Sequence, residues 1–260
     1  MQTINIRYQL YLHWRKIGFF VLGLILIQMD AYAQARFNEI SKAGQDEKLI
    51  SYGFFLAAHT NYYQLKYSEA FLDPNSGVGT DIESIVPVYN PGFSLGFLAI
   101  LRMHDQLNLM FTPKIGFYEF KTDINFYGNP ASSNSEIAFT RRTETVLSEV
   151  TMVEFPLLFK YKAQRFNNSR MFFTAGGSAM FRTKAQDEAD IDFIVTTGKD
   201  FTVDLGIGFD MYFRYFKFSP EIRFSHGLNN LYRPETTDAR VRDVISELRR
   251  KSITLYLHFQ

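Results

Sequence analysis

The stretch FTVDLGIGFDMYF, residues 201–213, alternates large apolar side chains with small or polar ones. A β-strand places successive side chains on opposite faces, so this stretch predicts a strand with one apolar face and one polar, glycine-containing face. The apolar face would point into the core of a soluble sandwich, or toward lipid in a membrane barrel. The alternation therefore constrains the local fold strongly and leaves the surroundings of the strand open.

Seven further stretches carry the same period, each with a second face that is polar or rich in glycine. We expect these strands over about Leu49–Leu65, Gly92–Met103, Leu107–Phe120, Val150–Lys162, Met171–Arg182, Phe216–Phe224 and Ser252–Phe259. Aromatic residues make up 17% of the 260 residues, with 27 Phe and 15 Tyr. That content is high for a soluble domain and suits a lipid-facing surface bordered by aromatic girdles.

The connections between the expected strands alternate between long and short. The long ones are Lys66–Pro91, Lys121–Glu149, Thr183–Lys199 and Ser225–Lys251, and the short ones are His104–Gln106, Ala163–Arg170 and Arg214–Tyr215. Long outer loops and short periplasmic turns are typical of an outer-membrane barrel with both termini in the periplasm. The sequence thus predicts an all-β fold, an eight-stranded antiparallel transmembrane β-barrel with four long extracellular loops and short periplasmic turns.

The N-terminus has the pattern of an export signal. Basic residues precede the apolar run IGFFVLGLILI at residues 17–27, and Ala31-Tyr32-Ala33 forms an A-x-A cleavage site before Gln34. An uncleaved anchor helix is the alternative, but the run is short for a membrane span. The expected organisation is a signal peptide at 1–33, a periplasmic N-terminal segment at 34–48 and a barrel at 49–260.

The polar face of each strand would point into the barrel. An eight-stranded barrel is just wide enough inside for side chains, so the inward charged residues should fill it. An unpaired buried charge is costly, so they should pair with one another. The network is either a structural plug or a selective conduit. Its expected members are Arg102, Lys114, Glu154, Lys160, Asp204, Asp210, Lys217, Glu221 and Arg223.

Other classes of site find little support in the sequence. The formal net charge of +1 gives no basic field for nucleic acid, and the lack of cysteine removes disulfides and thiolate chemistry. Ser225 and His226 could suggest a barrel hydrolase, but neighbouring strand residues point to opposite faces. The loop LDPNSGVGTD at 72–81 lacks the spacing of a calcium-binding EF-hand. We therefore expect no enzyme activity, cofactor, metal or small-molecule substrate.

Two strand segments, TMVEFPLLFKYK (151–162) and KFSPEIRFSHGL (217–228), resemble the PorT family, also called SprT, and the similarity covers nearly the whole mature chain. The resemblance implies an integral outer-membrane barrel required by the type IX secretion system of Bacteroidota, with gliding motility supported in some species. It implies contacts with outer-membrane lipid and other secretion components, and no catalytic residue. A small general barrel, either a passive pore or a surface-adhesion protein, is the alternative.

Overall fold

The computed structural model describes residues 48–127, 142–183, 194–235 and 237–260. The expected signal peptide, its cleavage site before Gln34 and nearly all of the expected periplasmic segment lie outside these described residues. No helix within the described part of the chain is long and apolar enough to cross a membrane.

The described chain is built almost entirely of antiparallel strands, with one short helix between the first and second strands and another between the ninth and tenth. The helices are α3 (Glu69–Leu72) and α4 (Ala239–Arg242). The strands are β1 (Ile50–Tyr67), β2 (Ile82–Val88), β3 (Asn90–Arg102), β4 (Leu107–Phe111), β5 (Lys114–Phe126), β6 (Arg142–Lys162), β7 (Ser169–Arg182), β8 (Lys199–Tyr212), β9 (Lys217–Gly227) and β10 (Ile245–Phe259).

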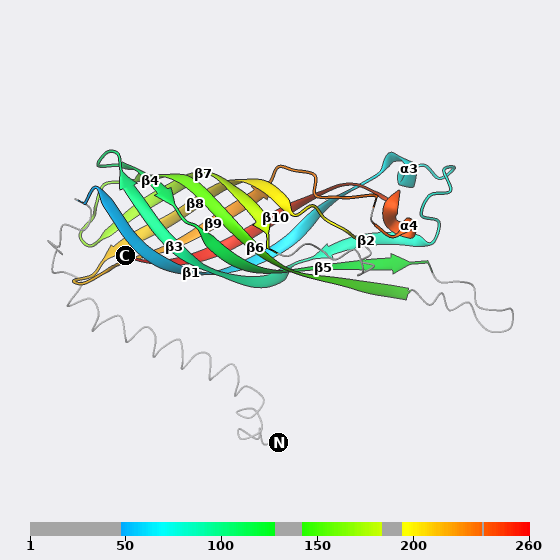
Figure 1. The fold of residues 1–260 in the computed structure, drawn as a ribbon, viewed down its shortest axis with the longest axis horizontal. Coiled ribbons are helices and arrows are strands. Elements are labelled where there is room, and N and C mark those ends of the chain that lie inside the picture. Colours follow the sequence, from blue (N-terminus) through cyan, green and yellow to red (C-terminus); the bar gives the residue numbers. More distant parts are fainter. Residues whose placement is uncertain (1–47, 128–141, 184–193, 236) are drawn as a thin grey trace, which may run out of the picture.

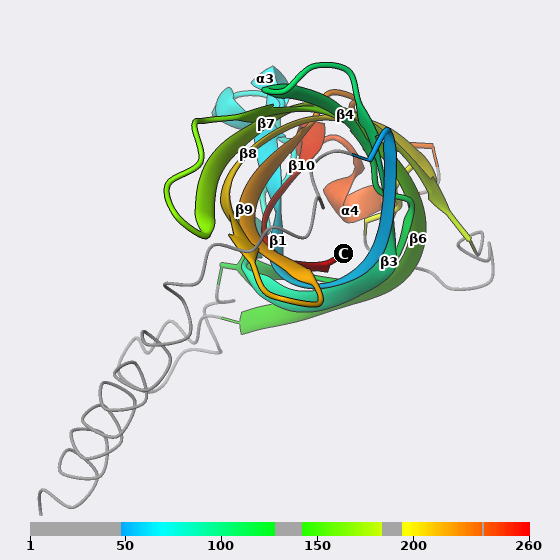
Figure 2. The same cartoon turned by 90° about the vertical axis from the view of Figure 1, so that its left-hand side faces the viewer.

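The strands close into a ring, seen end-on in Figure 2. The order runs β1, β10, β9, β8, β7, β6, then β4 together with β5, then β3, which pairs with β1 again. Strands β4 and β5 share one position in the wall, because both pair with β3 and with β6. Pro113 separates them, and proline has no N–H to give to a ladder. Strands β2 and β3 likewise share one position in the wall, because β3 pairs with the turn-end part of β5 and β2 pairs with its loop-end part.

The ten segments therefore make a ring consistent with eight strands, and the predicted all-β antiparallel barrel is confirmed. Residues 103–106, 163–168 and 213–216 form short turns at the end where β1 begins and β10 ends, which we call the turn end (Figure 1). The described parts of the longer connections and both helices lie at the opposite end, which we call the loop end.

The strands reach further toward the loop end than the sequence pattern predicted. The expected connection Lys66–Pro91 contains β2, and Lys121–Glu149 contains the end of β5 and the start of β6. Strand β10 likewise begins at Ile245, not at Ser252. The expected boundaries were wrong here because the two faces of the strands exchange their polarity, as β5 shows.

Along β5 the alternation of faces continues without a break while the chemistry of the faces inverts. Near the turn end, Ile115 and Phe117 are exposed on the exterior and Lys114 is buried inside. Near the loop end, Asp123 lies on the exterior and Ile124 is fully buried inside. The ring thus has two halves, which we call the band half, toward the turn end, and the loop half.

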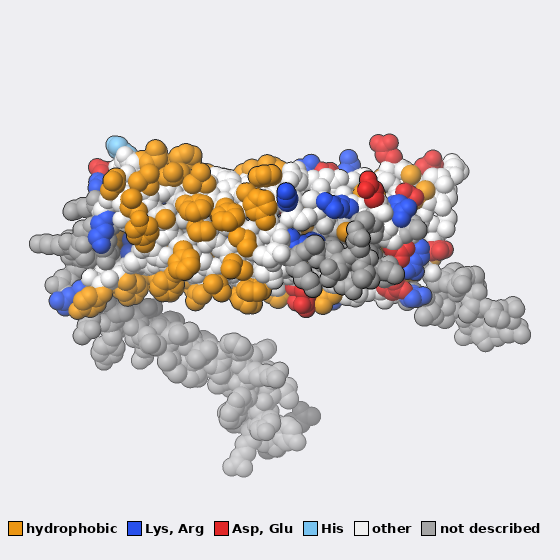
Figure 3. Space-filling view, viewed as in Figure 1, with side chains coloured by type: hydrophobic (Ala, Val, Ile, Leu, Met, Phe, Trp, Pro, Cys, Tyr) orange, Lys and Arg blue, Asp and Glu red, His pale blue; other side chains and the backbone are white. Residues whose placement is uncertain are grey.

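The exterior of the band half is a continuous apolar surface, which we call the apolar band. Figure 3 shows it as a hydrophobic region over the turn-end half, with charged side chains gathered over the loop half. Its exposed members include Phe54, Leu56, Phe93, Leu95, Phe97, Phe155, Leu157, Phe159, Phe173, Phe201, Val203, Leu205, Ile207, Phe209, Ile222, Phe224, Ile253 and Leu255.

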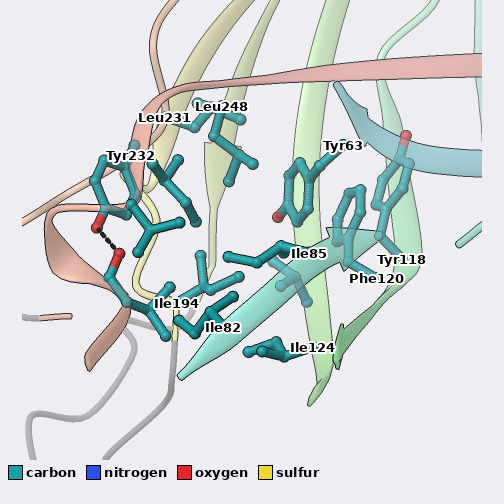
Figure 4. Packing of buried hydrophobic residues seen from close by; sticks show 14 of the residues in the cluster. Tyr63, Ile82, Ile85, Tyr118, Phe120, Ile124, Ile194, Leu231, Tyr232 and Leu248 are labelled. Atoms are coloured by element: carbon teal, nitrogen blue, oxygen red, sulfur yellow. Dashed lines mark hydrogen bonds between the residues drawn. The ribbon is translucent and has the colours of Figure 1, made fainter. Parts of the chain in front are cut away.

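The interior of the loop half is a hydrophobic core (Figure 4). Tyr63 of β1 and Phe120 of β5 stack with ring centroids 4.2 Å apart. Val241 and Val244, from the connection that carries α4, are fully buried against the strands. The Tyr232 hydroxyl donates a 2.7 Å hydrogen bond to the carbonyl of Arg242. The connection between β9 and β10 is therefore folded into the loop end of the ring.

Candidate functional site

The interior of the band half is where the structure gathers buried charge. Eight of the nine charged residues expected there are buried inside the ring; these are Lys114, Glu154, Lys160, Asp204, Asp210, Lys217, Glu221 and Arg223. They come from β5, β6, β8 and β9, whose inward positions alternate with the members of the apolar band. The period-2 alternation that places hydrophobic residues outside thus places these charges inside.

Arg102 is the ninth residue, and the structure places it outside the buried part of the network. It is the last residue of β3, its side chain is partly exposed, and it pairs with Asp105 in the adjoining turn. It falls on the inward face of β3, as expected. The strand ends at this residue, however, so the side chain lies at the rim of the ring.

Toward the turn end, Lys160 and Asp210 form an ion pair with 2.7 Å between Nζ and Oδ1. The Ser219 hydroxyl donates to the same carboxylate oxygen at 2.6 Å. The Lys160 ammonium also lies 3.6 Å from the centre of the Phe172 ring, close enough for a cation–π contact. A cation removed from water is thus compensated by an anion and by the face of a ring.

Glu221 is the centre of the next group of side chains. The guanidinium of Arg223 donates two hydrogen bonds to its carboxylate, at 2.9 and 3.0 Å. Thr174 donates to Glu221 at 2.6 Å, and His258 Nε2 lies 2.9 Å from the other oxygen. Arg223 in turn lies 4.1 Å from the centre of the Tyr256 ring. A carboxylate with this many donors is held in one position.

The third group lies on the side of β5 and β6. Lys114 Nζ is 3.0 Å from Glu154 Oε2, and the Tyr118 hydroxyl donates to the other oxygen of Glu154. Lys114 also donates to the Tyr256 hydroxyl at 2.9 Å, although Tyr256 belongs to β10 on another part of the wall. The network therefore crosses the interior and does more than link neighbouring strands.

Arg250 marks the level where the charged interior meets the hydrophobic core. It comes from β10, and its Nη1 lies 3.4 Å from the sulfur of Met152 on β6, directly across the ring. Its Nε is 4.0 Å from Asp200 Oδ2, and its guanidinium lies 5.1 Å from the centre of the Tyr118 ring. A contact between opposite walls shows that side chains meet across the interior at this level.

Sequence reasoning missed several interior residues. Arg250 fell within an expected loop, and the aromatic and histidine members were not considered as network members; these are His59, Tyr118, Tyr256 and His258. The two aromatic residues and the two histidines occupy the same inward-facing positions in the strand alternation as the charged residues. The alternation would therefore have identified these four. Gly206 is inward as expected, and a Cβ there would collide with Thr174 and Glu221, so the interior is as crowded as the glycines suggested.

No catalytic arrangement is evident at the positions that the sequence singled out. Ser225 lies at an inward position of β9 and His226 at an outward one, so they point to opposite faces. Within residues 48–127, 142–183, 194–235 and 237–260, no group of three or more His, Asp or Glu residues could hold a metal ion. The chemistry of the interior is that of ion pairing and hydrogen bonding.

Comparison with known protein families gives a match to the outer membrane protein beta-barrel domain over residues 32–233. Comparison with curated proteins gives no match.

Solved structures with a similar arrangement include OprG from Pseudomonas aeruginosa, with 9% identity, a TM-score of 0.38, and coverage of 80% of this chain and 92% of that chain. Neisserial surface protein A has 11% identity, a TM-score of 0.36, and coverage of 81% and 98%. The outer membrane protease OmpT from Escherichia coli has 13% identity, a TM-score of 0.33, and coverage of 81% and 93%.

Proposed function

The chain belongs to the outer membrane protein beta-barrel domain family, and from that premise we propose that it is a closed, non-enzymatic barrel required for protein export. An outer-membrane barrel places its apolar exterior against lipid, so the apolar band is the surface that contacts the membrane. The proposed export route is the type IX secretion system, with gliding motility as a second output where that process occurs.

The observation that carries the closed state is the set of contacts across the ring. Arg250 reaches Met152 on the opposite wall, and Lys114 reaches Tyr256 on a strand that is not its neighbour. Both Lys114 and Arg250 are almost completely buried. A ring of this size has little interior beyond its own side chains. The charged network is therefore proposed as a structural plug, and a passive pore is disfavoured.

The proposed link to type IX secretion rests on where the resembling segments lie. TMVEFPLLFKYK forms the band half of β6 and carries Glu154 and Lys160 inside the ring. KFSPEIRFSHGL is β9 with the residue that follows it, and it carries Lys217, Glu221 and Arg223 inside. The two stretches thus supply five of the eight predicted charges that are buried, so the resemblance lies in the network as well as in a general barrel pattern.

We further propose that the loop end faces the outside and the turn end faces the periplasm, with the signal peptide removed before Gln34. Both described ends of the chain lie at the turn end, as they do in barrels of this class. N-terminal sequencing of the protein isolated from outer membranes tests the cleavage, and a chain that begins at Met1 would contradict it.

Deletion of the gene tests the export function. We expect proteins that carry the C-terminal sorting domain to stay in the cell, and a plasmid copy of the gene to restore their secretion. The level of an unrelated outer-membrane barrel serves as the control for a general envelope defect. Normal secretion in the deletion strain would favour the general small barrel instead.

Planar-bilayer recordings of the purified protein test the closed interior separately. We expect no stable conductance, because side chains meet across the ring. Steady large openings would overturn the plug and support the passive pore.

A further inference from the structure

We propose that the exterior of β1, β9 and β10, directly above the apolar band, binds the phosphate groups of a phosphorylated glycolipid in the outer leaflet. The residues assigned to this role are His226, Arg249 and Lys251, which we call the cationic patch. The leaflet depends on the proposed orientation of the barrel, whereas the phosphate chemistry depends only on the positions of these side chains.

The strand register places the patch at the border of the apolar band. Lys251 of β10 lies directly opposite His226 of β9 and Tyr62 of β1. The next outward pair toward the turn end is Ile253 and Phe224, both exposed members of the apolar band. The cationic patch therefore begins where the hydrophobic surface stops, at the depth of lipid headgroups.

The protein itself balances only part of the positive charge of the patch. Arg249 lies on the same outward face as Lys251 and is paired with Glu247 at 2.5 Å. Among the described residues, neither the Lys251 ammonium nor the His226 imidazole has an ion-pair partner. A phosphate held between Lys251 and His226 would give the Lys251 ammonium a negative partner and would accept hydrogen bonds from both side chains.

The opposite side of the barrel has the reverse charge at the corresponding border. Glu119 of β5 and Glu149 of β6 lie directly opposite each other, two residues beyond Phe117 and Thr151 on the same outward faces. A phosphate would be repelled by these two carboxylates. Binding of an anionic headgroup is therefore disfavoured on the side of β5 and β6, and that side offers a matched control in Lys121.

Aromatic residues flank the patch where a lipid would pass from headgroup to acyl chain. Tyr62 contacts Tyr89 with ring centroids 4.4 Å apart, and Tyr62 neighbours Lys251 across the strand pair. Tyrosine is enriched at this depth because its ring suits the hydrophobic side and its hydroxyl suits the polar side. A lipid bound here would lay its acyl chains along Ile253 and Phe224.

Native mass spectrometry of the full protein in a mild detergent tests this assignment. The probes are bis-phosphorylated lipid A and the same lipid after removal of both phosphates. We expect the unmodified protein to bind the phosphorylated form and to prefer it over the dephosphorylated form. The double variant R249Q/K251Q should bind it roughly 25-fold more weakly, since each cation near a charged lipid surface contributes roughly fivefold.

Lys121→Gln on the acidic side is the control and should bind as the unmodified protein does. The shift in gel mobility on heating shows whether each variant is folded, and the single variant K251Q, with roughly a fivefold loss, serves if the double variant does not fold. Equal binding of the dephosphorylated lipid, or an equal loss in K121Q, would overturn the proposal. Because the measurement uses purified protein, its outcome is independent of the secretion assay.

Discussion

The band half and the loop half of this barrel use the same strands but opposite arrangements of polarity. In the band half, Phe155 is exposed on the outside of β6 while Glu154 is buried inside. In the loop half, Glu119 lies on the outside of β5 while Phe120 is buried inside. The difference follows from the solvent on the outside, which is lipid around the band half and water around the loop half.

This inversion separates the two sources of stability in the molecule. Burial of apolar surface from water stabilises the loop half, as it does a soluble domain. Lipid tails are as apolar as the side chains that they contact, so the same effect supplies little to the exterior of the band half. There the closed ladder of backbone hydrogen bonds and the paired charges inside hold the ring together. Substitutions of one kind should therefore have different effects in the two halves.

The largest effect should follow from breaking a buried ion pair in the band half. Lys160→Met leaves Asp210 without its cation inside the ring, which should lower the free energy of unfolding by about 3–5 kcal/mol. Urea unfolding in detergent micelles, monitored by far-UV circular dichroism, measures this free energy. The double variant K160M/D210L should cost less than K160M alone, because no unpaired carboxylate remains. A double variant as unstable as the sum of the single ones would contradict a paired network.

The next largest effect compares two leucines that are equally open to their surroundings. Leu205 in the apolar band is 56% exposed, and Leu147 on the exterior of the loop half is 49% exposed. Leu205→Arg places a cation in lipid and should cost about 2–4 kcal/mol in a bilayer. Leu147→Arg places it in water and should change stability by less than about 0.5 kcal/mol. Equal costs would mean that the apolar band does not face lipid.

Labelling checks the same comparison without a change of stability. The protein has no cysteine of its own, so single cysteines can be placed at positions 203, 205 and 207 and at positions 204 and 206. A quencher confined to lipid should reach labels at the odd positions and miss those at the even ones. No quenching at either set of positions would show that β8 does not lie in the membrane.

A smaller effect should distinguish a packed interior from a lipid-facing surface. Ile124 is fully buried in the loop half, and Ile124→Val should cost about 0.5–1.5 kcal/mol because it leaves a cavity. Ile207 belongs to the apolar band, and lipid can fill the space left by Ile207→Val, so we expect a change of only a few tenths of a kcal/mol. A larger cost at Ile207 would show that this position is packed against protein. Equilibrium unfolding of both variants in the same bilayer measures the difference.

Strand alternation predicted the band half well and the loop half poorly, for one physical reason. The sequence reasoning required an apolar outward face, which holds for β8 but fails for the loop half of β5, where Asp123 is outside and Ile124 inside. Period 2 alone cannot tell which face is outside. The break at Pro113 and the contact from Arg250 to Met152 depend on how distant strands meet, which a single sequence does not specify.

The smallest effect concerns an exposed ion pair in the loop half, as a counterpart to Lys160 and Asp210. Asp238 caps α4 by accepting a 2.9 Å hydrogen bond from the backbone N–H of Arg240, and its carboxylate lies 3.1 Å from the Arg240 guanidinium. These hydrogen bonds from Arg240 lower the pKa of Asp238 below its usual range. The pair is partly exposed, so its contribution should stay below about 1 kcal/mol.

The sign of the pH dependence follows from that lowered pKa. The contribution of Asp238 is present above its unfolded pKa of about 3.9 and is lost as the pH falls through the lower folded value. Hydrogen exchange at the amides of residues 240–244 should therefore accelerate only below about pH 4, after correction for the intrinsic rate. Asp238→Asn keeps a capping oxygen but removes the charge, so it should flatten this dependence while the strands stay protected.

Unchanged acceleration of exchange in D238N would mean that another group causes the acid sensitivity. Loss of strand protection in the same range would mean that the loop connection and the barrel unfold together, and that the two halves are less independent than their inverted polarity suggests.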